Sequence, residues 1–241
     1  MTTSLLTQRR HADPATDHVH VLSRHLLVAQ AIQAGLVQRE LPASASSWDD
    51  RFELSTLPVG QAVLLLDDLG DREALEEVCD LVQALPTRTV VLTDRLPGVV
   101  WGAVLAAGAA EVMSGTTTLA DVDDLLVRVL AGESVLSDRR RRSLEAEWTD
   151  WLAEDRELHA RAASLTPREH VILERLTQGQ RVSDIGSSLG VSEATVRSQV
   201  KSLRAKLGVD SQLGAVAIAH RLAGRLLDPH PVVVPAPRIG A

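Results

Sequence analysis

The 241-residue chain has a single cysteine, Cys79, so it can form neither an intramolecular disulfide nor a cysteine-based metal cluster. Aromatic residues are scarce, with four Trp, one Phe and no Tyr, so the core must consist mainly of Leu, Val, Ala and Ile. No stretch approaches the roughly 20 apolar residues that a membrane-spanning helix needs, and the first residues lack the apolar run of a signal peptide. These absences predict a cytoplasmic protein with no membrane span, no cofactor and no bound metal.

Charge is distributed unevenly along this acidic chain, whose formal net charge is −7. Residues 164–226 contain nine Lys or Arg and five Asp or Glu, whereas the remainder contains 16 basic and 27 acidic residues. The stretch VRSQVKSLRAKLGV, from Val196 to Val209, contains four basic residues and no acidic residue. An acidic body joined to a small basic segment predicts that the basic segment meets a polyanion.

The first half of the chain alternates short apolar runs with amphipathic segments. Continuous apolar runs such as AVLLLD are typical of parallel strands buried on both faces. The alternation predicts an α/β domain over residues 18–132, built on a doubly wound parallel sheet. Residues 41–60 are interpreted as loop, with one short helix near Asp49 to Leu54. The expected strands are 18–22, 62–67, 88–93 and 109–113, and the expected helices are 26–36, 71–85, 97–107 and 119–132.

Residues 133–163 form a predicted linker helix, since they are highly charged and show no strand pattern. Large apolar residues recur every seven positions in and just after it, at Leu144, Trp151, Leu158 and Leu165, with Trp148 on the same side. Two interpretations stay open. The stripe rests on a neighbouring domain, or it forms a dimer seam, although the heptads are too few to define a coiled coil.

Four short helices are predicted within residues 164–226. The first has a capped start, with Thr166 as N-cap, Pro167 at the first helical position and Glu169 three residues after the cap. The next two segments, VSDIGSSLG and SEATVRSQVKSLRAKLG, have the lengths and the turn of a helix-turn-helix. In that motif the second helix lies in the DNA major groove.

Residues on the second helix of this pair divide into two faces. A buried face is predicted at Val196, Val200, Leu203 and Leu207. The other side presents Arg197, Ser198 and Lys201 to a groove, while Arg204 and Lys206 are placed for phosphates. The alternative is a solvated helix that is basic by chance, which the neighbouring helices and caps disfavour.

From Leu165 to about Ala223, the sequence resembles the LuxR-type (NarL-type) DNA-binding domain. The matching pieces include LTPRE, Gly179, Ile185, TVR at 195–197 and KLG at 206–208. By position, the resemblance implies that Arg197, Ser198 and Lys201 face bases and that Thr195, Gln199 and Lys206 lie near the DNA backbone. It also implies a dimer contact in the last helix, at Ala215, Val216 and Ala219. Gly186 and Ser183 depart from the family pattern.

The front half resembles the receiver domain of a two-component response regulator, which has a flavodoxin-like sheet. The resemblance places Asp67 at the phosphate-accepting position and Thr93 at the switch hydroxyl. Ser23 and Arg24 stand where receivers have two acidic residues, and Gly115 stands where they have a lysine. The segment between the first helix and the strand at 62–67 is short, which predicts an eroded second strand and helix.

The chemistry of these replacements predicts a degenerate receiver pocket. Phosphoryl transfer to an aspartate needs a divalent cation, and such cations prefer carboxylate ligands. Ser23 and Arg24 supply at most one weak ligand and one repulsive charge, and Arg24 is free to pair with Asp67 instead. We therefore expect a receiver-like domain that ordinary phosphorylation does not switch.

Together these features predict a DNA-binding transcription regulator that is not an enzyme, acts on double-stranded DNA and forms a homodimer. Two alternatives stay open: the pocket senses a small molecule or a protein effector, or Asp67 is still phosphorylated. A cluster at His18, His20 and His25 is expected to be coincidental, because no acids or cysteines accompany it. Residues 1–17 are expected to be a disordered arm and residues 227–241 a Pro-rich tail.

Overall fold

The computed structural model describes residues 17–58 and 60–223. The expected tail at 227–241, and the expected arm apart from its last residue, lie outside the described residues. The described residues divide into two compact units, one up to Thr149 and one from Asp150, each of which is described by itself. Among the described helices, none combines the length and the apolar character needed to cross a membrane.

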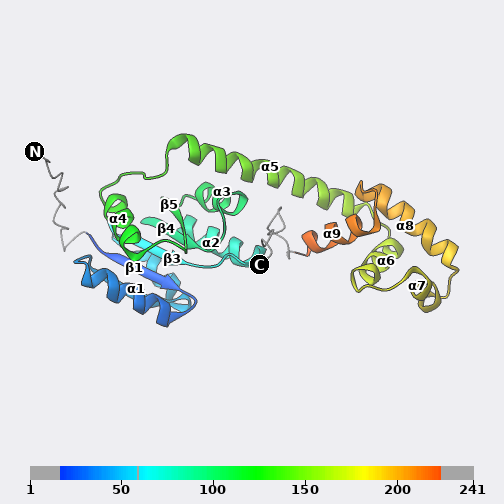
Figure 1. Ribbon diagram of the computed structural model, residues 1–241, viewed down its shortest axis with the longest axis horizontal. Coiled ribbons are helices and arrows are strands. Elements are labelled where there is room, and N and C mark those ends of the chain that lie inside the picture. The colour runs from blue at the N-terminus through cyan, green and yellow to red at the C-terminus, as the bar shows by residue number, and fades with distance from the viewer. Residues whose placement is uncertain (1–16, 59, 224–241) are drawn as a thin grey trace, which may run out of the picture. The chain divides into compact units, whose positions relative to one another are not determined.

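The first unit contains a five-stranded parallel sheet in the order β2-β1-β3-β4-β5 (Figure 1). Because all strands run in the same direction, their carboxyl ends lie at one edge of the sheet. This arrangement confirms the predicted doubly wound α/β class. The strands are β1 Val19–Ser23, β2 Ala43–Ser47, β3 Ala62–Leu66, β4 Arg88–Thr93 and β5 Glu111–Ser114.

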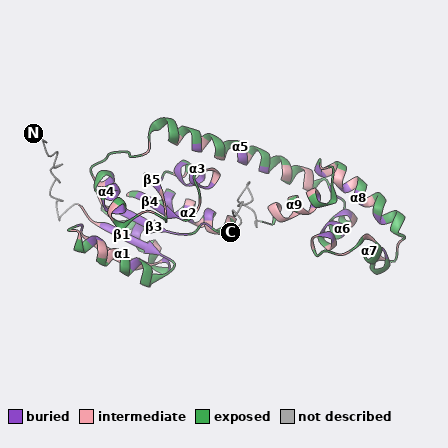
Figure 2. Cartoon of the chain, viewed as in Figure 1, coloured by how far each residue is buried: buried purple, intermediate pink, exposed green. Residues whose placement is uncertain are grey.

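Four helices follow the strands of this sheet. Residues from the first and the last of them share one hydrophobic cluster with the sheet, which includes Val21, Ala29, Leu64 and Leu126. The other two pack against each other, and Figure 2 shows most residues of β1, β3 and β4 as buried. The helices are α1 Leu26–Gln38, α2 Arg72–Ala84, α3 Val99–Ala106 and α4 Leu119–Leu130.

The prediction that residues 41–60 form only loop and a short helix is wrong for β2. Residues 43–47 pair with β1 along its whole length, from Val19 opposite Ala43 to Ser23 opposite Ser47. The sequence ASASS lacks β-branched and aromatic residues, so the strand depends on hydrogen bonds to its neighbour and gives no local signal. The expected erosion therefore holds only for the helix, since β2 leads into the 3-10 helix η1 Trp48–Thr56.

The long helix α5, Asp138–Ala163, contains the boundary between the two units. In the first unit, Leu144 is fully buried, and a Cβ on Gly102 would lie 2.0 Å from the Leu144 carbonyl oxygen. In the second unit, Trp151 is 7% exposed, and the guanidinium carbon of Arg221 lies 5.3 Å from the centroid of the Trp151 ring. The start of the apolar stripe is thus covered by the chain itself, which favours the linker interpretation over a dimer seam.

The second unit continues with four short helices around a separate hydrophobic cluster. The turn between the middle two has Gly190 in the left-handed conformation, with φ 65°, and the Val191 amide donates to the Gly186 carbonyl. Ala215 is fully buried in this cluster, so it cannot take the surface contact that the LuxR resemblance implied. The helices are α6 Pro167–Thr177, α7 Val182–Leu189, α8 Glu193–Leu207 and α9 Gln212–Leu222.

Candidate functional site

Helix α8 is the candidate nucleic-acid interface, and its two ends are defined by local sequence. The Ser192 hydroxyl accepts a hydrogen bond from the Thr195 amide at the start of the helix. Gly208 ends the helix in the left-handed conformation, with φ 72°. The predicted inner face is buried as expected, at Val196, Val200, Leu203 and Leu207.

The outer face of α8 exposes most of the residues expected at the groove. Arg197 has 70% of its side chain exposed, and its Nε and Nη2 lie 3.0 Å and 2.5 Å from Glu193 Oε1. Lys201 is exposed and has no ion-pair partner among the described residues. Thr195 and Ser198 are also exposed, and Gln199 is half-buried. The structure therefore places all five outward on the N-terminal two thirds of α8.

The two basic residues near the end of α8 instead make internal contacts. Lys206 Nζ lies 2.7 Å from Glu169 Oε2 and 3.1 Å from the Ser164 carbonyl oxygen. The Arg204 guanidinium donates to the Asp210 carbonyl. Their predicted contacts with phosphates stay predictions, and the internal bonds already use part of the donor capacity of each side chain.

Glu169 is a buried residue that forms the predicted capping box of α6 and also binds two residues of α8. It is 2% exposed and accepts hydrogen bonds from the Thr166 amide, the Ser202 hydroxyl and the Lys206 ammonium. Burial alone would raise the pKa of the Glu169 carboxyl, but the bonds from Lys206, Ser202 and Thr166 outweigh it and lower that pKa to about 2. The carboxylate thus fastens α8 to the start of α6.

A second candidate site lies at the carboxyl edge of the sheet in the first unit. The structure brings together all five predicted receiver positions around one pocket of about 500 Å³. Ser23 ends β1, Asp67 follows β3, Thr93 ends β4 and Gly115 follows β5, so the parallel topology gathers them. The fifth residue, Arg24, follows β1.

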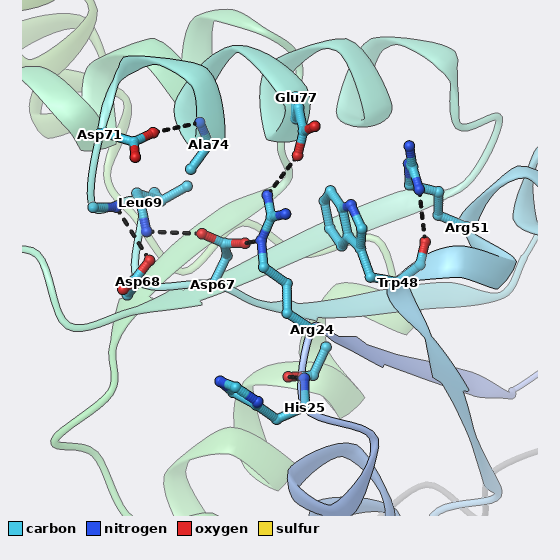
Figure 3. Close-up of polar contacts among 12 residues, drawn as sticks. Arg24, His25, Trp48, Arg51, Asp67, Asp68, Leu69, Asp71, Ala74 and Glu77 are labelled. Atoms are coloured by element: carbon cyan, nitrogen blue, oxygen red, sulfur yellow. Dashed lines mark hydrogen bonds and ion pairs between the residues drawn. The ribbon is translucent and has the colours of Figure 1, made fainter. Parts of the chain in front are cut away.

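Asp67 is held by two contacts that leave its side chain fully buried (Figure 3). Its Oδ1 accepts a hydrogen bond of 2.8 Å from the Leu69 amide, and its Oδ2 lies 2.6 Å from Arg24 Nε. The predicted pairing of Arg24 with Asp67 is therefore confirmed. Leu69 is itself fully buried at a positive φ of 51°, an unusual conformation for a leucine that sequence reasoning did not find.

Arg24 also contacts two residues that the sequence did not connect with it. Its Nη2 lies 2.7 Å from Glu77 Oε2, and its guanidinium carbon lies 4.3 Å from the centroid of the Trp48 ring (Figure 3). Partial burial alone would lower the pKa of Arg24, but the bonds to Glu77 and Asp67 outweigh it and raise that pKa. Arg24 therefore stays charged beside Asp67.

The position of the expected lysine is occupied by a carboxylate. A Cβ on Gly115 would lie 2.1 Å from Asp94 Oδ1, so Asp94 covers the space into which a longer side chain would start. Asp94 directly follows Thr93 and also lines the pocket. Sequence reasoning missed Asp94, although its place next to the switch position was visible.

A parallel α/β unit followed by a helical unit with a helix-turn-helix is the organisation of a response regulator. Residues 163–219 match the family described as bacterial regulatory proteins, luxR family. This match supports the resemblance of the chain to LuxR/NarL-type response regulators.

Two curated proteins and one solved structure are similar to this chain. The chain is 31% identical over 149 residues to the "Probable transcriptional regulatory protein NarL" of Mycobacterium tuberculosis, covering 60% of this chain and 63% of that protein. It is 25% identical over 158 residues to the "Transcriptional regulatory protein LiaR" of Bacillus subtilis, covering 66% and 72%. The chain thus spans less than two thirds of the first relative's length. The response regulator ChrA of a haem-sensing two-component system is 21% identical, with coverages of 86% and 98% and a TM-score of 0.42.

The depressed pKa of Glu169 predicts acid sensitivity of the second unit. Its stabilising effect is fully present above about pH 4.5 and is lost as the pH falls toward 2, because the unfolded state then binds a proton that the folded state resists. Glu169→Gln should reduce the stability of this unit by about 2 kcal/mol at pH 7 and flatten that acid dependence. Amide hydrogen exchange in α6 and α8 measures both effects.

Glu174→Gln is the matched control, because Glu174 lies on the same helix and is exposed. It should leave the exchange rates and their pH dependence near those of the wild type. Equal acid dependence in the wild type and Glu169→Gln would contradict the assigned role of Glu169.

Proposed function

We propose that the chain is a cytoplasmic transcription regulator that binds double-stranded DNA through α8, and that it is not an enzyme. The observation that carries this proposal is the exposed set of Arg197, Ser198 and Lys201 on the outer face of a helix-turn-helix. A recognition helix contacts base edges with its N-terminal part and phosphates with flanking residues. The acidic remainder of the chain confines DNA attraction to this surface.

Arg197 is the proposed base-reading residue, with Ser198 and Lys201 beside it. An arginine donates to both O6 and N7 of guanine, which makes guanine the preferred partner. Thr195 and Gln199 lie next to these residues and are proposed to contact the DNA backbone. Arg197 must first leave Glu193, and such exposed pairs contribute little stability, so the rearrangement costs little.

Arg197→Ala should cost about 1–3 kcal/mol on the specific operator and relax base preference at one position. The operator is first found by genome-wide footprinting, and binding is then measured on operator and random duplexes at several salt concentrations. Arg156→Ala, an exposed arginine of α5, is the control and should change neither affinity. An equal loss on operator and random DNA for Arg197→Ala would exclude base reading by this residue.

The pocket supports a second part of the proposal, namely that phosphorylation of Asp67 does not switch the regulator. Arg24 occupies one oxygen of the acceptor carboxylate, and Ser23 supplies no carboxylate for a divalent cation. At Gly115 no ammonium is available for a phosphoryl group, and Asp94 would repel it. The pair formed by Arg24 and Asp67 thus replaces the charge neutralisation that a cation would give.

With Mg²⁺ and acetyl phosphate, the wild-type chain should gain no phosphoryl mass, as intact mass spectrometry measures. Asp67→Asn should change operator affinity less than twofold, because there is no phosphorylated state to lose and Arg24 keeps its bond to Glu77. A phosphorylatable receiver treated in parallel is the control for the donor. An acid-labile phosphate on the wild type, with a large loss of binding in Asp67→Asn, would show that Asp67 is still an acceptor.

We also propose a homodimer that exists without modification or DNA, since one helix-turn-helix makes few base contacts. The linker stripe is largely covered within the chain, so the main seam is placed on the first unit. Helix α1 contains no charged residue, and its outer side exposes Leu27 by 78% and Val37 by 48%. A smaller contact by Val216 and Ala219 of α9 is proposed to form on DNA.

Sedimentation at micromolar concentration should show a dimer of the unmodified chain. Leu27→Asp should shift it to monomer, because a symmetric seam would bury two uncompensated charges. Leu96→Asp is the matched control, since Leu96 is 81% exposed outside α1, and it should sediment as the wild type does. A monomer that dimerises only on operator DNA would instead place the seam in α9.

A further inference from the structure

The receiver-like pocket is large enough for a small organic molecule. Its volume of about 500 Å³ lies within the range of about 300–1,000 Å³ that is usual for ligand pockets. Val28 and Ile32 of α1 line one wall, and Leu66 and Leu92 lie at the ends of β3 and β4. An apolar surface of this kind, next to polar groups at the sheet edge, offers burial to an apolar body and anchors for a polar end.

The charges that line the pocket determine whether the polar end of a ligand is positive or negative. Asp67, Asp68 and Asp94 line it, and the Arg24 guanidinium is bound to Asp67 and Glu77. The Asp68 carboxylate accepts a 3.1 Å bond from the Gly70 amide and forms no ion pair with a described residue. Asp94 is exposed and has no hydrogen bond or ion pair with any described residue. The remaining field is negative, so it repels anions and attracts cations.

The arrangement of these carboxylates favours an organic cation over a metal ion. Within the described ranges, no three His, Cys, Asp or Glu residues are grouped so that they could hold a metal. Arg24 Nε already lies 2.6 Å from Asp67 Oδ2. A primary ammonium needs only two or three acceptor oxygens, and Asp68 and Asp94 present them at the pocket.

We propose that this pocket binds a small primary amine with a short apolar body, in place of a phosphoryl group. The ammonium lies at Asp94 and Asp68, and the apolar body lies against Val28 and Ile32. The inference rests on the proposed function, because a phosphorylatable Asp67 would need the same space. A primary amine would then be the effector that this regulator senses independently of phosphorylation.

Hydrogen bonds around the pocket connect the proposed ligand site to the neighbouring loops and to α3. Arg95 donates to the carbonyls of Asp68 and Gly70, at 3.1 Å and 2.9 Å, and so ties the loop after β4 to the loop after β3. The Trp101 indole of α3 donates to the Arg95 carbonyl at 2.8 Å. A ligand held at Asp68 and Asp94 therefore bears on both loops and, through Arg95, on the start of α3.

Calorimetric titration of the full chain with linear amines from butylamine to octylamine, at pH 7 and low salt, tests the proposal. Each amine is compared with the alcohol and the carboxylate of equal length. At least one amine should bind one per chain, at least tenfold more tightly than its alcohol, with no binding of its carboxylate. Added salt should weaken this binding, because the attraction is electrostatic.

Asp94→Asn should weaken binding of that amine at least fivefold, whereas Asp124→Asn, an exposed carboxylate of α4 outside the pocket, should leave it unchanged. Circular dichroism establishes that both variants fold. Absence of amine binding, equal binding of amine and alcohol, or full affinity in Asp94→Asn would each overturn the inference. Phosphate on Asp67 of the same sample would overturn the proposed function as well, so the two failures are distinguishable.

Discussion

The ion pair between Arg24 and Asp67 determines what the first unit is able to do. A fully buried carboxylate is costly unless a charged or hydrogen-bonding partner accompanies it, and Arg24 supplies that partner within 2.6 Å. The same guanidinium reaches Glu77 on α2 and stacks on Trp48, so it joins β1, β3, α2 and η1. The positive charge beside Asp67 therefore belongs to a side chain of the protein and cannot dissociate as a bound metal ion would. Under the proposed function, this internal pair takes the place of the divalent cation that phosphorylation of an aspartate requires.

The second unit uses the same physics for a different result. Glu169 is buried and needs a cation, and Lys206 of α8 supplies it from 37 residues away. This contact ties α8 to the start of α6 and leaves the Lys206 side chain only partly exposed. In both units, a buried acid thus pairs with a basic side chain from a distant part of the sequence.

Sequence reasoning succeeded where topology alone determines position. Ser23, Asp67, Thr93 and Gly115 each lie at a strand end, and parallel strands gather such ends whatever the side chains do. It failed for β2, because ASASS gives no local strand signal and pairs only through its neighbour. It also missed Asp94, whose approach to Gly115 depends on how two loops come together. The contact between Glu169 and Lys206 likewise needs the tertiary packing of two helices.

The distribution of free charge on α8 bears on how DNA recognition is divided. Of its four basic residues, Arg204 and Lys206 bind groups of their own unit and Arg197 binds Glu193. Of these four, only Lys201 has a side chain without a hydrogen-bond or ion-pair partner among the described residues. Few phosphate contacts mean weak attraction to random DNA, since each contact adds to non-specific affinity through counterion release. Under the proposed function, occupancy of an operator must then come from base contacts and from pairing of two chains on adjacent half-sites.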